Sequence, residues 1–226
     1  MYDDIKFVYL KSHPLFHGVP EQTIKDACSL VKVKTVYRGE TFGFGEGNYS
    51  KLFLLIKGKI KITELDDTDN ELIKDLLTAP DLFGDLSLEG KPSQDEMAEA
   101  LTSNTIICSF TIPDFKKLMQ ESPVIAFNFV NTVNRKLKSL EGRHSDLVFR
   151  DAKSRLIRFI KNWARTDGSR VGDKIILNNY LTHSDIAGVI ATSRQSVNVL
   201  FNELRESGLL YYNRKKIELN DPLSWN

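Results

Sequence analysis

Residues 182–208 have the sequence Thr-His-Ser-Asp-Ile-Ala-Gly-Val-Ile-Ala-Thr-Ser-Arg-Gln-Ser-Val-Asn-Val-Leu-Phe-Asn-Glu-Leu-Arg-Glu-Ser-Gly. This stretch predicts two short helices separated by one tight turn. Ser193 is a good N-cap for the second helix, because its hydroxyl can accept a hydrogen bond from a backbone N–H of the first turn. The apolar residues that follow, at the spacing of one buried helical stripe, are Val197, Leu200, Phe201 and Leu204. The stretch therefore predicts a helix-turn-helix.

The outer face of the second predicted helix is polar. Its residues are Arg194, Gln195, Asn198 and Asn202. Such side chains can form hydrogen bonds with base edges in the major groove of DNA. We therefore predict that residues 193–206 are a recognition helix and that the partner is double-stranded DNA. The alternative is a helical pair in an ordinary protein core, which the polar outer face argues against.

The flanks of this stretch support the same prediction. Thr182, followed three residues later by Asp185, predicts a capping box at the start of the first helix. Small side chains at Ala187 and Ala191 allow the two helices to approach closely, and residues 209–219 predict two strands around a basic turn, in the manner of a wing. The candidate phosphate contacts are Thr182, His183, Ser184, Ser196, Arg214, Lys215 and Lys216.

The charge is distributed unevenly along the chain. The 226 residues carry a formal net charge of +1, and 41% of them are hydrophobic, which suits one large or two modest globular domains. Residues 1–150 contain 19 Lys and Arg against 22 Asp and Glu, whereas residues 151–226 contain 12 against 8. The basic excess lies with the predicted helix-turn-helix, as contact with DNA phosphates requires.

Several other classes of protein find no support in the sequence. No apolar run approaches the roughly 18 residues of a membrane-spanning helix, and the first residues lack the pattern of a secretory signal. Cys28 and Cys108 lack metal-ligand spacing, and we find no motif of an enzyme active site. We expect a cytoplasmic protein that is not an enzyme, with no metal site and no membrane partner.

The periodicity changes along the chain. Residues 14–34 carry a short helical pattern, and residues 33–112 alternate with a period of two between glycine turns, which indicates an all-β sandwich or barrel. A long helix is predicted from Pro123, with Ser122 as its N-cap, to about residue 145. The predicted domains are residues 1–120, 121–148 and 149–226.

The long predicted helix carries a seam with alternating spacings of four and three, which is a heptad pattern. The seam positions are Ala126, Val130, Val133, Leu137, Leu140, His144 and Leu147. Such a seam needs a partner helix, and we predict a parallel homodimer. The alternative is a helix that packs only on its own β-domain, and we expect Phe127 and Phe129 to pack in that way.

Several features of the chain occur in the order of a known family. They are Pro14-Leu-Phe, the β-rich residues 33–112, Phe83-Gly-Asp-Leu-Ser-Leu88, the long helix, the helix that contains Arg155, and Thr192-Ser-Arg-Gln-Ser-Val197. Together they resemble the Crp/Fnr family of bacterial transcription regulators over essentially the full chain.

This resemblance implies an α+β fold. It has an N-terminal antiparallel β jelly roll of the cupin type, a dimerisation helix and a C-terminal winged helix-turn-helix domain. The resemblance also implies a symmetric homodimer that binds a near-palindromic promoter site, with RNA polymerase as a further partner.

The effector pocket of the family is altered in this chain. In members that bind cyclic AMP, a Gly-Glu-Leu segment followed by Arg-Ser holds the phosphate. Gly84, Asp85 and Leu86 match the first part, but the Arg-Ser positions fall on Asp95 and Glu96, whose carboxylates would repel a phosphate.

The purine side of the pocket is altered too, because the two hydroxyl residues that read the purine fall on Leu140 and Glu141. The resemblance therefore implies a degenerate pocket and argues against cyclic AMP in the usual mode. An unknown small-molecule effector stays open.

Other sensory cofactors of the family are also disfavoured. An iron–sulfur cluster needs four cysteine ligands, and the chain has two cysteines. For haem, the candidate axial ligands His13, His17 and His144 are better explained as structural or exposed residues. For Cys28 and Cys108 two alternatives stay open. One is a redox switch, and the other, which is commoner, is a buried structural thiol.

The resemblance also bears on base recognition. Arg194 and Gln195 match family positions that reach base edges, where arginine favours guanine and glutamine favours adenine. A second family arginine falls on Val199, which can at most touch a thymine methyl group, so Asn198 is a further candidate reader. The alternative function is a cyclic-nucleotide-binding signalling module that acts on a protein partner, and the altered pocket weakens it.

Overall fold

The computed structural model describes residues 2–46, 49–65, 71–90 and 96–220. The chain divides into two compact units, Met1–Ser139 and Leu140–Asn226. The division falls inside the long helix α4 (Pro123–Phe149), which the sequence predicts as a separate dimerisation segment. Within the described residues, no helix is both long and apolar enough to span a membrane.

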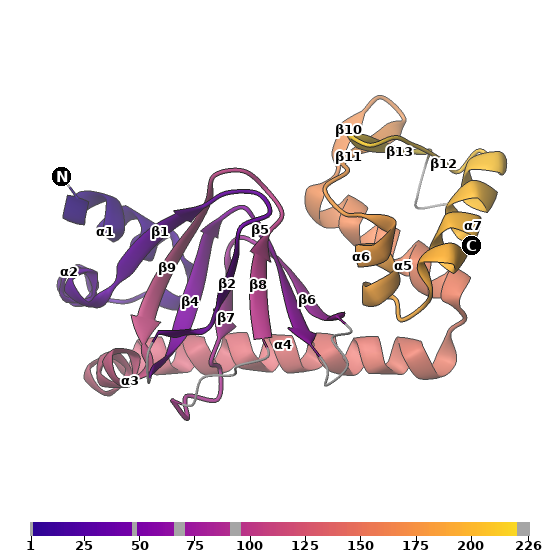
Figure 1. Ribbon diagram of the computed structural model, residues 1–226. Coiled ribbons are helices and arrows are strands. Elements are labelled where there is room, and N and C mark those ends of the chain that lie inside the picture. Colours follow the sequence, from indigo (N-terminus) through magenta and orange to yellow (C-terminus); the bar gives the residue numbers. More distant parts are fainter. Residues whose placement is uncertain (1, 47–48, 66–70, 91–95, 221–226) are drawn as a thin grey trace. The chain divides into compact units, whose positions relative to one another are not determined.

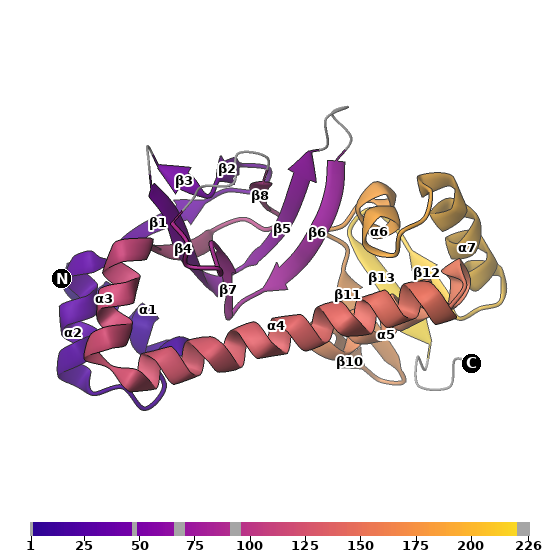
Figure 2. The same ribbon diagram turned by 90° about the horizontal axis from the view of Figure 1, so that it is seen from below.

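The first unit begins with helical segments, namely α1 (Tyr2–Ser12), the 3₁₀ turn η1 (Pro14–Phe16) and α2 (Glu21–Leu30). The sequence predicts η1 and α2 but not α1. Leu10 of α1 is nevertheless fully buried, beside Leu15 and Phe16 of η1. Figure 2 shows α1 and α2 at one end of the unit together with α3 (Ile112–Glu121).

The centre of this unit is a β-roll of two antiparallel sheets (Figure 1). Its strands are β1 (Lys32–Val36), β2 (Thr41–Gly43), β3 (Gly45–Glu46), β4 (Tyr49–Lys57), β5 (Lys59–Leu65), β6 (Glu71–Thr78), β7 (Asp81–Gly84), β8 (Glu96–Ala100) and β9 (Thr105–Thr111). One sheet has the order β1-β9-β4-β3 with β7 beside β4, and the other has the order β2-β8-β5-β6. The predicted antiparallel roll is therefore confirmed.

Aromatic side chains fill the space between the two sheets. Phe53 and Phe83 stack with their ring centroids 5.0 Å apart, and Phe42 and Phe44 pack against both of them. One strand departs from simple alternation, because Lys61 on β5 is buried. Its ammonium group lies 2.8 Å from Glu99 and 3.2 Å from Glu71, and these carboxylates compensate its charge.

The long helix α4 starts at Pro123, as predicted, and continues past residue 145 to Phe149. Ile125 and Phe129 bury its inner face on the first unit, and Lys136 pairs with Asp81 on β7 at 3.0 Å. Phe127 is a correction, since 67% of its surface is exposed and it does not pack on the β-domain. Phe129, two residues later, is rotated by about 160° around the helix at 100° per residue, so only one of the two rings faces the core of the first unit.

The second unit contains the predicted winged helix-turn-helix. Its elements are α5 (Ala152–Asp167), β10 (Ser169–Val171), β11 (Lys174–Asn178), α6 (His183–Val189), α7 (Arg194–Glu206), β12 (Leu210–Tyr212) and β13 (Lys216–Asn220). The strands form one antiparallel sheet in the order β10-β11-β13-β12, beside the three helices (Figure 1). Leu156 and Ile160 of α5, Val197 and Phe201 of α7, and Ile217 of β13 are fully buried.

Candidate nucleic-acid interface and effector pocket

The caps of the helix-turn-helix form as the sequence predicts. The Thr182 hydroxyl accepts a hydrogen bond from the N–H of Asp185 at 3.0 Å, and the Asp185 carboxylate accepts one from the N–H of Thr182 at 2.7 Å. The Ser193 hydroxyl accepts from the N–H of Ser196 at 3.0 Å. Each cap satisfies a first-turn N–H and so determines where α6 and α7 begin.

The turn between α6 and α7 depends on a residue outside the motif. Arg155 on α5 donates from Nε to the carbonyl oxygen of Ile190 at 2.7 Å and from Nη2 to that of Ala191 at 3.1 Å. Its Nη1 donates to the carbonyl oxygen of Arg150 at 2.6 Å. A cation at the C-terminal end of a helix is also favoured by the helix dipole. Arg155 is a functional residue whose role sequence reasoning missed.

The two alanines near the turn differ in their roles. Ala187 is buried on α6, where its small side chain lets α7 approach. Ala191 is exposed and has a φ of +50°, in the left-handed region. A small side chain reduces the steric cost of that conformation, so Ala191 serves the turn rather than the helix contact.

The predicted base-contacting residues are not all equally accessible. Arg194, Gln195 and Val199 are exposed on α7. Asn198 is half-buried, and its Oδ1 forms a short hydrogen bond with Nδ1 of His183. Arg194 and Gln195 are therefore the most exposed polar side chains at the start of α7. Asn198 is less exposed, and His183 binds its oxygen atom.

The predicted phosphate contacts on α6 and α7 also have distinct surroundings. Thr182 and Ser184 are exposed, whereas His183 is half-buried, with its ring centroid 4.8 Å from that of Phe201 and 5.5 Å from that of Tyr212. The Ser196 hydroxyl lies 2.9 Å from that of Ser193. His183 is thus part of an aromatic cluster between α6, α7 and β12.

The wing presents the predicted basic residues. Asn213 Oδ1 accepts from the N–H groups of Lys215 and Lys216, at 2.8 and 3.0 Å, and so shapes the turn between β12 and β13. Arg214, Lys215 and Lys216 are all exposed. The Lys216 ammonium group pairs with Glu218 at 2.6 Å, which raises the pKa of Lys216. Arg214 and Lys215 therefore remain the better candidates for phosphate contact.

The first unit contains a cavity of about 250 Å³ at the predicted effector pocket. Its lining residues are Phe44, Ser50, Gly84, Asp85, Leu86, Ser87 and Glu96. Gly84 has a φ of +91°, and a Cβ there would lie 2.4 Å from the carbonyl oxygen of Lys51. Only glycine fits this position. Four of the predicted pocket residues thus come together, while Asp95 lies outside the described residues.

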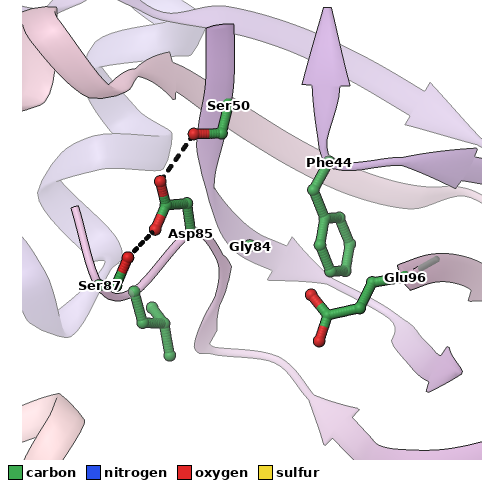
Figure 3. A pocket seen from close by; sticks show the side chains of 7 residues that line it. Phe44, Ser50, Gly84, Asp85, Ser87 and Glu96 are labelled. Carbon is green, nitrogen blue, oxygen red and sulfur yellow. Dashed lines mark hydrogen bonds between the residues drawn. The ribbon is translucent and has the colours of Figure 1, made fainter. Parts of the chain in front are cut away.

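Internal hydrogen bonds hold the Asp85 carboxylate. Figure 3 shows it between the hydroxyls of Ser50 and Ser87, which donate to it at 2.6 and 2.7 Å. The N–H of Gly90 donates at 2.9 Å. Burial opposes ionisation of Asp85, but these donors and the N–H of Leu88 outweigh it and hold the pKa of Asp85 below its usual range. The carboxylate is therefore an internal anion around which residues 84–90 wrap.

The other acidic residue of the pocket is also paired. Glu96 lies across the pocket from Asp85 (Figure 3) and forms an ion pair with Lys74, which also contacts Glu64 at 2.8 Å. Among the residues that the structure describes, the lining thus contains two carboxylates and no basic side chain. Leu140 and Glu141, the predicted purine-reading positions, are exposed on α4.

The histidines and cysteines considered as cofactor ligands are each either buried or exposed at the surface, and the buried His13 is hydrogen-bonded through both ring nitrogens. His13 is buried, with its Nδ1 accepting from the N–H of Leu15 and its Nε2 bound to the carbonyl oxygen of Asp81, and burial lowers the pKa of His13 to about 4. His17 and His144 are exposed. Cys28 and Cys108 are both buried and are not joined in a disulfide.

Burial raises the pKa of Cys108 to about 12, so this thiol stays protonated and poorly nucleophilic. Among the described residues, no group of His, Cys, Asp and Glu is arranged to hold a metal ion.

The predicted seam of α4 lies open along the helix. Val130, Leu137 and Leu140 each expose more than half of their surface, and His144 is exposed as well. Val133 is half-buried against the core of the first unit. The exposed apolar set is completed by Val124, Phe127, Leu147, Val148 and Phe149. This stripe is larger than isolated surface apolar residues account for.

Comparison with known proteins agrees with both units. A model of the cyclic nucleotide-binding domain matches residues 33–122, and a model of the Crp-like helix-turn-helix domain matches residues 154–223. The global nitrogen regulator of Synechococcus elongatus is 27% identical over 195 residues, which cover 86% of this chain and 88% of that protein. The CRP-like cAMP-activated global transcriptional regulator of Mycobacterium tuberculosis is 23% identical over 208 residues, which cover 92% of each protein.

A solved structure gives the same result. The structure of a CooA mutant from Carboxydothermus hydrogenoformans has a TM-score of 0.70 with this chain, at 25% identity and with 86% of each chain covered. The roll, the winged helix-turn-helix and these matches decide against the alternative of a signalling module that acts only on a protein partner. The chain belongs to the Crp/Fnr family of transcription regulators, whose helix-turn-helix domain binds DNA.

Proposed function

We propose that this regulator binds a near-palindromic promoter site as a homodimer and that cyclic AMP in the usual mode does not control it. The observation that carries the DNA-binding part is the exposed polar start of α7, where Arg194 and Gln195 project from a helix whose opposite face is fully buried. A small-molecule effector and RNA polymerase are the further partners that we propose, by analogy with the transcription regulators that the chain resembles.

The exposed stripe on α4 supports the homodimer. Within it, the seam positions Val130, Val133, Leu137, Leu140, His144 and Leu147 recur at the three- and four-residue spacings that let two helices pack along a common seam. Association in pairs would bury apolar side chains that a single chain leaves in water, at a gain of about 25 cal/mol per Å². A pair of recognition helices related by a two-fold axis then matches a DNA site with two half-sites.

Arg194→Ala tests the proposed base readout. Arginine donates two hydrogen bonds to O6 and N7 of guanine, so we expect the variant to lose about 1–3 kcal/mol of binding free energy on a cognate site and to relax the preference at one base pair of each half-site. The measurement is fluorescence anisotropy with cognate and scrambled duplexes.

Arg170→Ala is the matched control for this experiment. Arg170 is exposed on β10, in the same unit, and the substitution removes the same charge. We expect it to leave the base preference unchanged. An equal loss of affinity by Arg194→Ala on cognate and scrambled DNA would show that this residue contacts only phosphates.

The state of the pocket supports the proposal on cyclic AMP. A phosphate in the cavity would meet the carboxylate of Glu96, and like charges in an interface cost several kcal/mol. The Ser50 and Ser87 hydroxyls, which are suitable donors for a ligand, already donate to Asp85.

Calorimetric titration with cyclic AMP tests this second part. We expect no binding heat at ligand concentrations up to about 100 µM, which correspond to a binding free energy weaker than about −5.5 kcal/mol. The cAMP-activated relative from Mycobacterium tuberculosis is the positive control under the same conditions. Submicromolar binding by this chain would contradict our interpretation of Asp95 and Glu96.

A further inference from the structure

The side chain of Asn198 is held from inside the second unit. Asn198 lies in the first half of α7, and its Oδ1 forms a short hydrogen bond with Nδ1 of His183, the first residue of α6. An amide oxygen can only accept, so the hydrogen of this bond belongs to Nδ1 of the imidazole ring. Among the described residues, Nδ2 of Asn198 has no hydrogen-bond partner.

The ring that makes this bond is itself fixed. His183 packs against Phe201 at 4.8 Å and Tyr212 at 5.5 Å between ring centroids, and these two rings meet at 5.1 Å. The cluster joins the start of α6, the middle of α7 and strand β12. Because three rings pack mutually, the imidazole ring is held in place beside Asn198.

We propose that His183 is a positioning residue for base recognition, which turns the oxygen of Asn198 into the protein and leaves only its amide N–H groups for the DNA. This inference rests on the proposed function, because it concerns the same recognition helix. A free asparagine recognises adenine with both ends of its amide, accepting from N6 and donating to N7. With Oδ1 directed toward His183, the acceptor half of that pair is turned away from the DNA.

The remaining donor selects a different base edge. In the major groove, N7 and O6 of guanine and O4 of thymine are acceptors, whereas adenine places its single acceptor N7 beside the N6 donor, which an amide N–H cannot pair with. Arg194, one turn earlier on α7, is also a donor without acceptor capacity. The start of the recognition helix therefore presents donors at Arg194 and Asn198, and we expect guanine or thymine, rather than adenine, at the base pair that Asn198 contacts.

Selection of bound sequences from a random DNA library tests this inference with the full-length protein and four variants. His183→Phe keeps an aromatic ring in the cluster but removes the donor, whereas His183→Asn keeps a donor near the position of Nδ1 but removes the ring. The other two are Asn198→Ala and the double variant His183→Phe/Asn198→Ala. Thermal unfolding confirms that each variant folds.

The expected results concern one base pair in each half-site. The unmodified protein and His183→Asn should prefer guanine or thymine there, and His183→Phe should shift the preference toward adenine by about tenfold. Asn198→Ala should lose the preference, and adding His183→Phe to it should change nothing further, since the effect of His183 passes through Asn198.

Two results would overturn the inference. One is a His183→Phe protein that binds more weakly on all sequences with an unchanged base preference, because His183 would then serve packing alone. The other is adenine at this base pair for the unmodified protein, because the amide oxygen would then face the DNA. If the unmodified protein enriches no sequence at all, the proposed function itself fails.

Discussion

Leu137→Asp is expected to convert the proposed homodimer into monomers. Leu137 exposes 52% of its surface in the single chain and lies in the middle of the α4 stripe. In a symmetric pair, the two introduced carboxylates would be buried near each other, and the effective cost is several kcal/mol for each ion. Sedimentation velocity should then report the mass of one 25.7 kDa chain instead of twice that mass.

The same variant should lose most of its affinity for a site with two half-sites. A dimer engages the second half-site at a high effective concentration, and loss of that link lowers affinity by about 100-fold or more. Affinity for an isolated half-site should change far less, which separates loss of association from loss of the DNA-binding fold.

Ser139→Asp is the matched control. Ser139 is exposed on the same helix, two residues away, and points about 160° from Leu137 at 100° per residue. The substitution adds the same charge away from the stripe, and we expect the dimer to persist. Dimers of Leu137→Asp at the same protein concentration would place the interface elsewhere.

Arg155→Met is expected to destabilise the second unit by about 3 kcal/mol. The substitution preserves much of the apolar stem but removes the charge-assisted hydrogen bonds to the carbonyl oxygens of Ile190, Ala191 and Arg150. Hydrogen bonds that involve a charged group contribute about 1.5–3 kcal/mol each, and water replaces part of this at the exposed Ala191. Both tryptophans follow residue 140 in the sequence, so urea unfolding followed by tryptophan fluorescence reports on this unit.

Arg155→Met should also weaken DNA binding at temperatures where the unit remains folded. The Arg155 hydrogen bonds hold the turn that leads into α7, and α7 carries the base contacts that we propose. We expect at least a tenfold loss of affinity.

Arg158→Met, one turn further along α5, is the control for both effects. Arg158 is half-exposed and pairs with Asp146 at 3.0 Å, and such a surface pair contributes less than about 1 kcal/mol. If the two variants lost equal stability, the Arg155 hydrogen bonds to the turn would stabilise the unit no more than a surface ion pair does.

Local patterns account for the parts of the fold that the sequence predicts well. The N-caps at Thr182 and Ser193 and the start of α4 at Pro123 depend on contacts within three or four residues, so they can be read directly from the spacing. The many short strands follow from alternation with a period of two between glycine turns, and the family resemblance implies their arrangement as an antiparallel roll.

The errors arise where a pattern does not say which partner covers a side chain. Phe127 and Phe129 are two residues apart on α4 with the same side chain, yet only Phe129 is buried. Lysine side chains are mostly exposed in folded proteins, yet Lys61 is enclosed between Glu71 and Glu99. In both cases the outcome depends on neighbours from other elements.

The sequence by itself determined that this chain is a Crp/Fnr-type regulator with a roll, a seam-bearing helix and a winged helix-turn-helix, because periodicity, capping and motif order are local properties. Only the tertiary structure decided which residues from distant segments support these parts. It places Arg155 on the turn 35 residues away, turns His183 onto Asn198 across 15 residues, and closes Ser50 onto Asp85 across 35 residues. Such contacts join elements that meet only when the core packs, and spacing along the chain carries no record of them.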